Sequence, residues 1–212
     1  MGWFVYRRHL SHSRVKNLFK FVSAKMDTVF TVESALEFDA CFHLEYSHDI
    51  TAYEAQPEGF MYEYNGRACP YTPDFKINHS ENGSQFLEIK PVEKTNDPDF
   101  IERFKAKRTQ STNNGIPLIL VTENQIRINP ILYNLKLLHR YSGSRNLTSV
   151  QIFLLSEIKK IGKVSIQFLT NNIKSDEDNI FSLVLNLLAK GYLRTNITDD
   201  IFNMNTTVWC TE

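Results

Sequence analysis

A change in hydrophobic period near residue 50 constrains the fold more than any other feature of the sequence. Between Thr31 and Tyr46, apolar residues recur at helical spacing, which predicts an amphipathic helix. From Ile50 onward the period becomes two, which predicts strands, and Asn65-Gly66 supplies the positive φ angles of a tight hairpin. The predicted strands are Ile50–Gln56, Phe60–Tyr64, Arg67–Phe75 and Phe86–Val92.

Two more helices and a strand follow in the next fifty residues. Asn96-Asp97-Pro98 provides an N-cap and a proline for the first helical position, so a helix is expected from there to about Asn113. Ile116–Thr122 is a continuous apolar run of strand length. Another helix is expected from Asn129-Pro130 to about Tyr141. The order of elements predicts an α/β fold with a mixed β-sheet flanked by helices.

The small polar stretch Ser142-Gly143-Ser144 is typical of a linker and predicts a domain boundary. Beyond it, the sequence predicts three helices followed by two strands, the pattern of a small winged-helix-like domain. We therefore expect a basic N-terminal arm (1–30), a main domain (31–143) and a C-terminal domain (144–212). The expected C-terminal elements are helices at 149–161, 164–172 and 175–190 and strands at 192–197 and 206–210.

The charge distribution is more informative than the total charge. Lys and Arg number 24, as do Asp and Glu, so the formal net charge is zero. By segment the net charges are +5 for 1–30, −10 for 31–100, +6 for 101–145 and −1 for 146–212. The longest apolar runs, such as Ile116–Val121, are too short to cross a bilayer, and the N-terminus lacks the apolar stretch of a signal peptide. We expect a soluble, cytoplasmic protein with no membrane partner.

Two predicted strands carry a charged pattern suited to catalysis. Because side chains alternate along a strand, Glu88 and Lys90 point to the same face. If Asn78–Ser84 forms the hairpin loop, Asp74 lies near Glu88 on that face. Two neighbouring carboxylates repel each other unless a cation joins them, and Mg²⁺ prefers oxygen ligands of this kind. Such an ion activates water and stabilises charge at phosphorus, which points to phosphodiester hydrolysis.

Each of these residues also has a simpler interpretation. Asp74, Glu88 and Lys90 could form a solvent-facing, salt-bridged strand pair. Glu37, on the helix before the strands, could be an ordinary surface residue, and Glu33, one turn earlier, competes with it for a role in the site. We favour Glu37 because its neighbours one and two turns later are apolar.

Four short motifs follow one another along the chain: Ser34-Ala35-Leu36-Glu37, Glu54-Ala55-Gln56-Pro57, Tyr71-Thr72-Pro73-Asp74-Phe75 and Leu87-Glu88-Ile89-Lys90-Pro91. In this order they resemble the motifs of TnsA, the endonuclease subunit of heteromeric cut-and-paste transposases, which has a restriction-endonuclease-like PD-(D/E)xK fold. The similarity spans about residues 31–141.

The resemblance implies a Mg²⁺-dependent endonuclease, with Mn²⁺ as a substitute, that cuts the 5′ ends of a transposon in double-stranded DNA. An integrase-type transposase would cut and join the 3′ ends, and an ATP-dependent regulator would complete the assembly near the bacterial nucleoid. By position, Glu37, Asp74 and Glu88 would bind the metal, with the carbonyl of Ile89 as a further ligand. Lys90 would be the active-site lysine.

Two basic clusters are candidates for DNA contact, although either could be a merely solvated surface. A third region, the C-terminal domain, is a poor candidate for groove reading because Asp176-Glu177-Asp178 opens its third helix and would repel phosphates. We expect that domain to dock protein partners instead. The basic clusters are Arg7, Arg8, Arg14 and Lys16, and Arg103, Lys105, Lys107 and Arg108.

Two other functions stay open at the level of sequence. The chain could be a stand-alone nuclease of restriction or resolvase type, or a non-catalytic module that organises a transposase. The intact set of acids with its lysine disfavours the second possibility, because mutually repelling carboxylates have no structural advantage.

Overall fold

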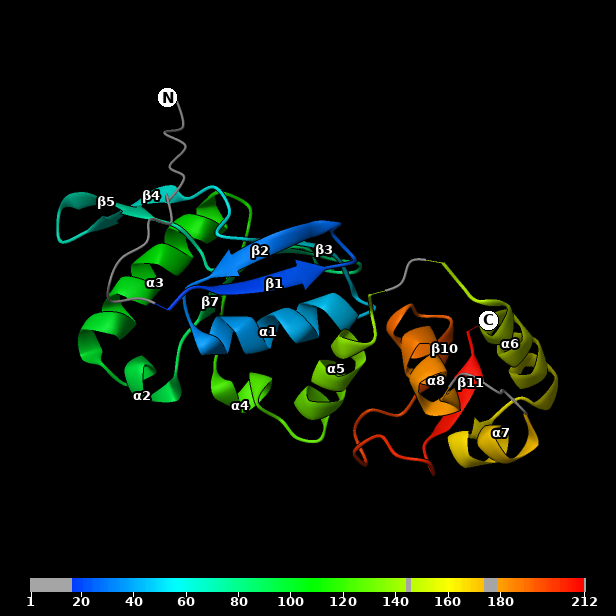
Figure 1. Cartoon of the computed structure of the whole chain (residues 1–212). Coiled ribbons are helices and arrows are strands. Elements are labelled where there is room, and N and C mark those ends of the chain that lie inside the picture. The colour runs from blue at the N-terminus through cyan, green and yellow to red at the C-terminus, as the bar shows by residue number, and fades with distance from the viewer. Residues whose placement is uncertain (1–16, 144–145, 174–178, 212) are drawn as a thin grey trace. The chain divides into compact units, whose positions relative to one another are not determined.

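The computed structural model describes residues 17–143, 146–173 and 179–211. The chain divides into two compact units, the first ending at Ile128 and the second beginning at Asn129 (Figure 1). In the described ranges, no helix is long and apolar enough to cross a membrane. The predictions for Arg7, Arg8, Arg14 and Lys16, and for Asp176-Glu177-Asp178, lie outside the described residues.

A four-stranded mixed sheet is the centre of the first unit. Its strand order is β3-β6-β7-β8; the first two pairings are antiparallel, and β7 and β8 are parallel. A parallel pair requires a long crossover, and two helices supply it here. The predicted mixed α/β architecture, consistent with a restriction-endonuclease-like fold, is confirmed. Its strands are β3 (Ile50–Ala55), β6 (Phe75–His79), β7 (Gly83–Ile89) and β8 (Leu118–Val121), with crossover helices α2 (Val92–Thr95) and α3 (Pro98–Asn113), and the short α4 (Glu123–Ile126) follows β8.

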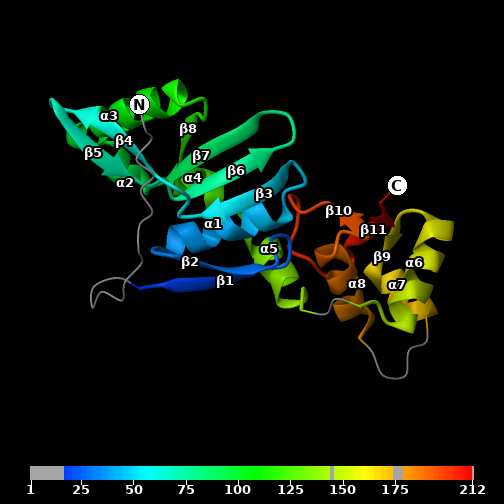
Figure 2. The same ribbon diagram turned by 90° about the horizontal axis from the view of Figure 1, so that it is seen from above.

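The predicted long strand Arg67–Phe75 is wrong, because the chain leaves one sheet and enters another within it. β4 (Phe60–Tyr64) and β5 (Arg67–Tyr71) form a separate two-stranded sheet, and the chain joins the main sheet at Phe75. The hairpin lies alongside α3 (Figure 2). The β4–β5 hairpin is separate from the main sheet because its aromatic side chains are buried among residues of α3, β7 and β8. The contributing side chains are Phe60, Tyr62 and Tyr71, packed with Phe86, Leu118, Phe104 and Ala106.

The prediction of an extended basic arm is wrong for residues 19–30, which belong to a β-hairpin. β1 (Phe19–Ser23) pairs antiparallel with β2 (Thr28–Val32). Phe21 is buried and meets Phe42 of the following helix edge to face, with ring centroids 5.1 Å apart. The strands are short, and apolar Val22 and Val29 are exposed while polar Ser23 is buried, so the alternation of apolar and polar residues is too weak to indicate strands.

Helix α1 (Ala35–Tyr46) packs against this hairpin and confirms the helix predicted before the strands. Ser34 is its N-cap and accepts a hydrogen bond from the backbone N–H of Glu37 at 3.1 Å. The helix begins later than the periodicity indicates because residues up to Val32 belong to β2.

The second unit contains four helices and a three-stranded sheet among its described residues. Three predicted helices and both predicted strands are present near their expected positions, and a short additional strand, β9, joins the sheet in the order β10-β11-β9. The elements are α5 (Ile131–Arg140), α6 (Ser149–Ile161), β9 (Val164–Ser165), α7 (Ile166–Asn172), α8 (Ile180–Ala189), β10 (Leu193–Thr195) and β11 (Thr207–Cys210).

Helix α5 lies in the second unit, although the sequence assigns it to the main domain. The buried side chain of Asn134 explains the grouping. Its amide nitrogen donates to the carbonyls of Ile197 and Asp200 at 3.1 and 2.8 Å, and its oxygen accepts from the N–H of Phe202 at 3.0 Å. These bonds tie α5 to the segment between β10 and β11.

Candidate active site

Asp74 is positioned by the ladder between two neighbouring strands. It directly precedes β6, and its N–H donates to the carbonyl of Leu87 on β7 at 3.0 Å. Its Oδ2 accepts from the N–H of Ile89 at 2.7 Å. Backbone pairing therefore holds this carboxylate against the end of β7, close to Glu88.

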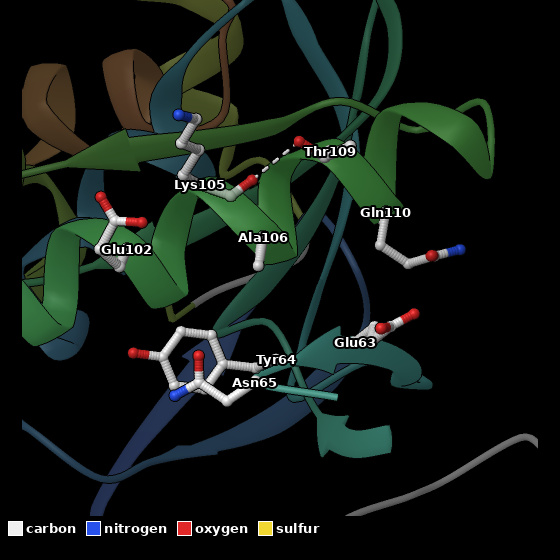
Figure 3. A pocket seen from close by; sticks show the side chains of 8 residues that line it. All are labelled: Glu63, Tyr64, Asn65, Glu102, Lys105, Ala106, Thr109 and Gln110. Atoms are coloured by element: carbon white, nitrogen blue, oxygen red, sulfur yellow. Dashed lines mark hydrogen bonds between the residues drawn. The ribbon is translucent and has the colours of Figure 1, made fainter. Parts of the chain in front are cut away.

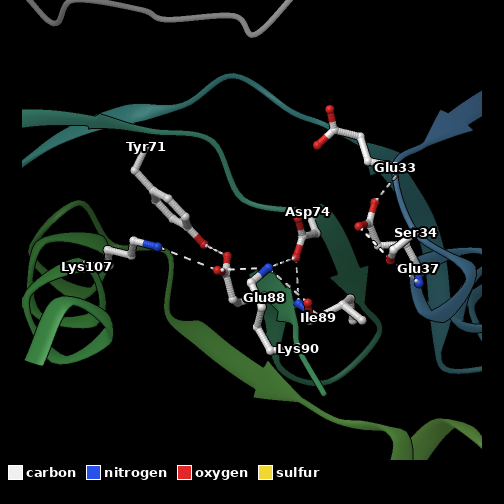
Figure 4. A network of polar contacts seen from close by, with 9 residues as sticks. All are labelled: Glu33, Ser34, Glu37, Tyr71, Asp74, Glu88, Ile89, Lys90 and Lys107. Atoms are coloured by element: carbon white, nitrogen blue, oxygen red, sulfur yellow. Dashed lines mark hydrogen bonds and ion pairs between the residues drawn. The ribbon is translucent and has the colours of Figure 1, made fainter. Parts of the chain in front are cut away.

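Lys90 joins the groups predicted to form the site (Figure 4). Its Nζ lies 3.3 Å from Oδ2 of Asp74, 3.2 Å from Oε1 of Glu88 and 3.0 Å from the carbonyl oxygen of Ile89. The structure thus brings Asp74, Glu88, Ile89 and Lys90 together, with three oxygen groups around one cation.

Burial makes the charges of this cluster costly. Asp74 and Glu88 are 7% and 3% exposed. Burial raises the pKa of Asp74 to about 7; Lys90 opposes this rise, while the charges of Glu88 and Glu37 add to it. Burial alone would lower the pKa of Lys90, but Asp74 and Glu88 raise it above its ordinary value. The ammonium and the two carboxylates therefore depend on one another.

Glu37 lies close enough to influence Asp74, but its carboxylate serves the start of α1. Its Oε1 accepts from Oγ of Ser34 at 2.8 Å, and its Oε2 accepts from the N–H of Glu33 at 3.0 Å. This is a variant of the capping box. Glu37 is buried, whereas Glu33 is half-buried. Across the described part of the chain, no three His, Cys, Asp or Glu side chains form a group that could hold a metal ion.

Comparison with known families gives one match. The family of the TnsA-like endonuclease N-terminal domain matches residues 47–123. Residues 47–123 are therefore similar to a TnsA-like endonuclease N-terminal domain, and this segment is called the TnsA-like domain below. The matched segment includes Asp74, Glu88 and Lys90, and it begins after Glu37. No curated protein matches the chain.

Two further side chains belong to the site of the TnsA-like domain. The hydroxyl of Tyr71 donates to Oε2 of Glu88. Nζ of Lys107, from α3, lies 3.5 Å from Oε1 of Glu88 and 4.1 Å from the centroid of the Tyr71 ring. Sequence reasoning placed Lys107 only in a basic cluster and gave Tyr71 no role, because their meeting depends on how α3 and the β4–β5 hairpin pack. These residues line an open cleft of about 280 Å³ with Pro70, Thr72, Asp74 and Lys90.

The four side chains of the predicted basic cluster on α3 have different surroundings in the TnsA-like domain. Arg103 forms an ion pair with Asp99 at 2.8 Å, and its guanidinium lies 4.9 Å from the centroid of the Tyr64 ring. Lys105 is exposed beside a separate polar groove of about 380 Å³, with its ammonium pointing away from Tyr64 (Figure 3). Arg108 is exposed as well. Of the four predicted DNA contacts on α3, Lys107 is the residue that meets the acidic cluster.

Two further polar residues, Gln56 and His79, lie where the chain leaves a strand. Gln56 directly follows β3 with a left-handed φ of 50°, and its N–H donates to the carbonyl of Asp74 at 2.9 Å. Nδ1 of His79 accepts from the N–H groups of Glu81 and Asn82 at 3.1 and 3.3 Å, in the turn between β6 and β7.

Proposed function

We propose that this chain is a metal-dependent DNA endonuclease that acts as the nuclease subunit of a transposase. The observation that carries the proposal lies within the TnsA-like domain. There, Asp74, Glu88 and the Ile89 carbonyl converge on the ammonium group of Lys90. A surface salt bridge would explain charge pairing, but not the burial of both carboxylates where they line a cleft.

The donor groups fit a hard divalent cation. Carboxylate and carbonyl oxygens are the ligands that Mg²⁺ and Mn²⁺ accept, and Mg²⁺ commonly takes only one or two carboxylates while retaining waters. Asp74, Glu88 and the carbonyl of Ile89 would hold the ion, with Glu37 as a nearby acid. The raised pKa of Asp74 indicates a carboxyl group that needs more positive charge to stay ionised. When bound, such an ion supplies an activated water and stabilises charge at phosphorus.

Backbone and side-chain groups of this chain hold the two carboxylates in place, and Lys90 lies beside them. The N–H of Ile89 fixes Asp74, and the hydroxyl of Tyr71 fixes Glu88, so neither carboxylate is free to turn. Lys90 places a positive charge beside both acids, where it can hold a water or neutralise a phosphate oxygen. Preorganised charges of this kind cost no rearrangement at the moment of reaction.

The proposed role in transposition is cleavage of the 5′ strands at transposon ends, with an integrase-type transposase acting on the 3′ strands and an ATP-dependent regulator as a further partner. The second unit would serve assembly. Its described helices and three-stranded sheet support a winged-helix-like docking domain, because they follow the expected order of three helices and a wing.

Strand-specific end cleavage by the reconstituted transposase complex tests the proposal. Asp74→Ala should reduce 5′-strand cutting by at least about 100-fold and leave 3′-strand cutting intact, because it removes a predicted metal ligand without touching the partner's site. Asp99→Ala is the matched control, since Asp99 is an exposed acid of the same domain whose partners are Arg103 and the hydroxyl of Tyr64. Unchanged 5′ cutting by the Asp74 variant would refute the assignment.

A further inference from the structure

The carboxylate of Glu88 has one negative charge but is surrounded by two ammonium groups and a hydroxyl donor. Tyr71 donates to its Oε2, and Lys90 lies 3.2 Å from its Oε1. Lys107 approaches the same Oε1 at the longer distance of 3.5 Å. Both oxygens of Glu88 therefore have partners without Lys107, so the second ammonium is not needed to satisfy the carboxylate.

Lys107 is nevertheless held at a defined place. Its Nζ lies over the face of the Tyr71 ring, 4.1 Å from the centroid, and Tyr71 itself is buried. A cation over an aromatic face is stabilised by the negative potential of the ring. The Lys107 side chain remains partly exposed, and it lines the same cleft as Asp74 and Lys90.

Positive charge at this position is suited to a polyanion. The cleft holds two carboxylates and two ammonium groups, so it is already close to electrically balanced by its own side chains. Any divalent cation that bound there would leave an excess of positive charge, which the phosphates of a DNA strand would compensate.

We propose that Lys107 contacts a DNA phosphate next to the cleaved bond, and that Glu88 and Tyr71 hold its ammonium in the cleft before DNA binds. This inference rests on the proposed nuclease function. It separates Lys107 from the other basic residues of α3, whose side chains lie outside the cleft. Lys107 is thus a positioning residue for substrate, distinct from the acids and from Lys90.

The test compares DNA binding by reconstituted complexes that contain wild type, Lys107→Met or Lys105→Met. Binding is measured over a series of salt concentrations with Ca²⁺ in place of Mg²⁺, so that the oxygen ligands hold a divalent cation while cleavage is suppressed. Lys107→Met should weaken binding by about 5- to 10-fold and reduce the slope of log affinity against log salt by about 1, because one phosphate contact is lost. Lys107→Arg should restore both quantities, and the exposed Lys105→Met should change them less.

A second arm locates the contact. The phosphate next to the cleaved bond is replaced by an uncharged methylphosphonate. Wild type should lose affinity on this DNA, whereas Lys107→Met should lose little more, because the two changes remove the same interaction. The proposal would be overturned if the losses of affinity from Lys107→Met and from the methylphosphonate were additive. It would also be overturned if Lys107→Met bound unmodified DNA as tightly as wild type does. Lys107→Gln, which keeps a donor toward Glu88, serves as the second variant if the Met variant does not fold.

Failure of this inference can be told apart from failure of the proposed function. If Asp74→Ala loses 5′ cutting while Lys107→Met binds DNA as wild type does, the nuclease assignment stands and the role of Lys107 is wrong. If Asp74→Ala still cuts the 5′ strand, the nuclease assignment itself is wrong.

Discussion

Asp74 shows how much a single residue's behaviour depends on its surroundings. As an isolated aspartate it would be ionised at any physiological pH, but it is buried beside Glu88 and within reach of the charge of Glu37. Lys90 provides only partial compensation, and the pKa of Asp74 rises to about 7. The carboxyl group therefore changes its charge near neutral pH in the absence of metal.

This shift predicts a pH dependence of stability for the metal-free protein. Because the pKa is raised, the folded state keeps its proton between about pH 4 and 7, where the unfolded chain has released it. The contribution of Asp74 to stability is thus present at low pH and is lost as pH rises toward 7. Relative to Asp74→Asn, wild type should lose on the order of 3 kcal/mol of unfolding free energy over this range.

Urea denaturation in EDTA at pH 4.5, 6 and 7.5 measures this difference. The Asn variant keeps the size of the side chain but cannot titrate, so it isolates the effect of Asp74 from that of the other ionisable groups. Parallel pH profiles for the two proteins would contradict the prediction.

At the scale of elements, the β1–β2 hairpin is attached to α1 through its turn. Nζ of Lys25 donates to the carbonyls of Leu44, Ser47 and Ile50 at 2.7, 2.8 and 2.9 Å. The carboxylate of Glu45 also binds this turn. It accepts from the N–H groups of Ala24 and Lys25, both at 2.9 Å, and from Oγ of Ser23 at 2.6 Å. It accepts in addition from the hydroxyl of Tyr53 at 2.7 Å. Lys25 thus satisfies carbonyls at and beyond the end of α1.

Lys25→Met should therefore lower the free energy of unfolding by about 2 to 3 kcal/mol, because three carbonyl groups lose a charged donor. Lys20→Met is the matched control: Lys20 lies on the exposed face of β1, and its replacement should change stability by less than about 0.5 kcal/mol. Urea denaturation of the two variants measures the effect, and equal stabilities would show that the turn is not anchored by Lys25.

At the scale of the whole molecule, each of the two units has buried apolar side chains of its own. Ile77 and Phe75 are buried in the main sheet of the first unit, and Leu154 and Ile158 are fully buried in the second. Units with separate cores can unfold separately, so damage to one core is expected to remain local.

Leu154→Ala should destabilise the second unit by about 2 to 5 kcal/mol, since it leaves a cavity at a fully buried position. Hydrogen exchange followed by mass spectrometry should show faster exchange in peptides of α6 to α8 and unchanged exchange in peptides of β6 and β7. Ile77→Ala should produce the reverse pattern. Faster exchange throughout the chain in either variant would mean that the two units unfold together.

The sequence alone determined most of the longer helices and the strands of the main sheet, and the meeting of Asp74, Glu88 and Lys90. These follow from local rules, because strand alternation and hairpin pairing bring residues near in sequence to the same face. The same rules failed where buried patterns were short or interrupted, as in the β1–β2 hairpin and the strand predicted across Tyr71 and Phe75.

Only the tertiary structure decided which distant residues share the site. Lys107 meets Glu88 because α3 crosses between parallel strands and packs on the β4–β5 hairpin, and no spacing in the sequence specifies that contact. The double use of Glu37, as helix cap and as a charge near Asp74, likewise depends on where α1 lies. Local periodicity fixes which way a side chain points along its own element, whereas the packing of elements fixes what it meets.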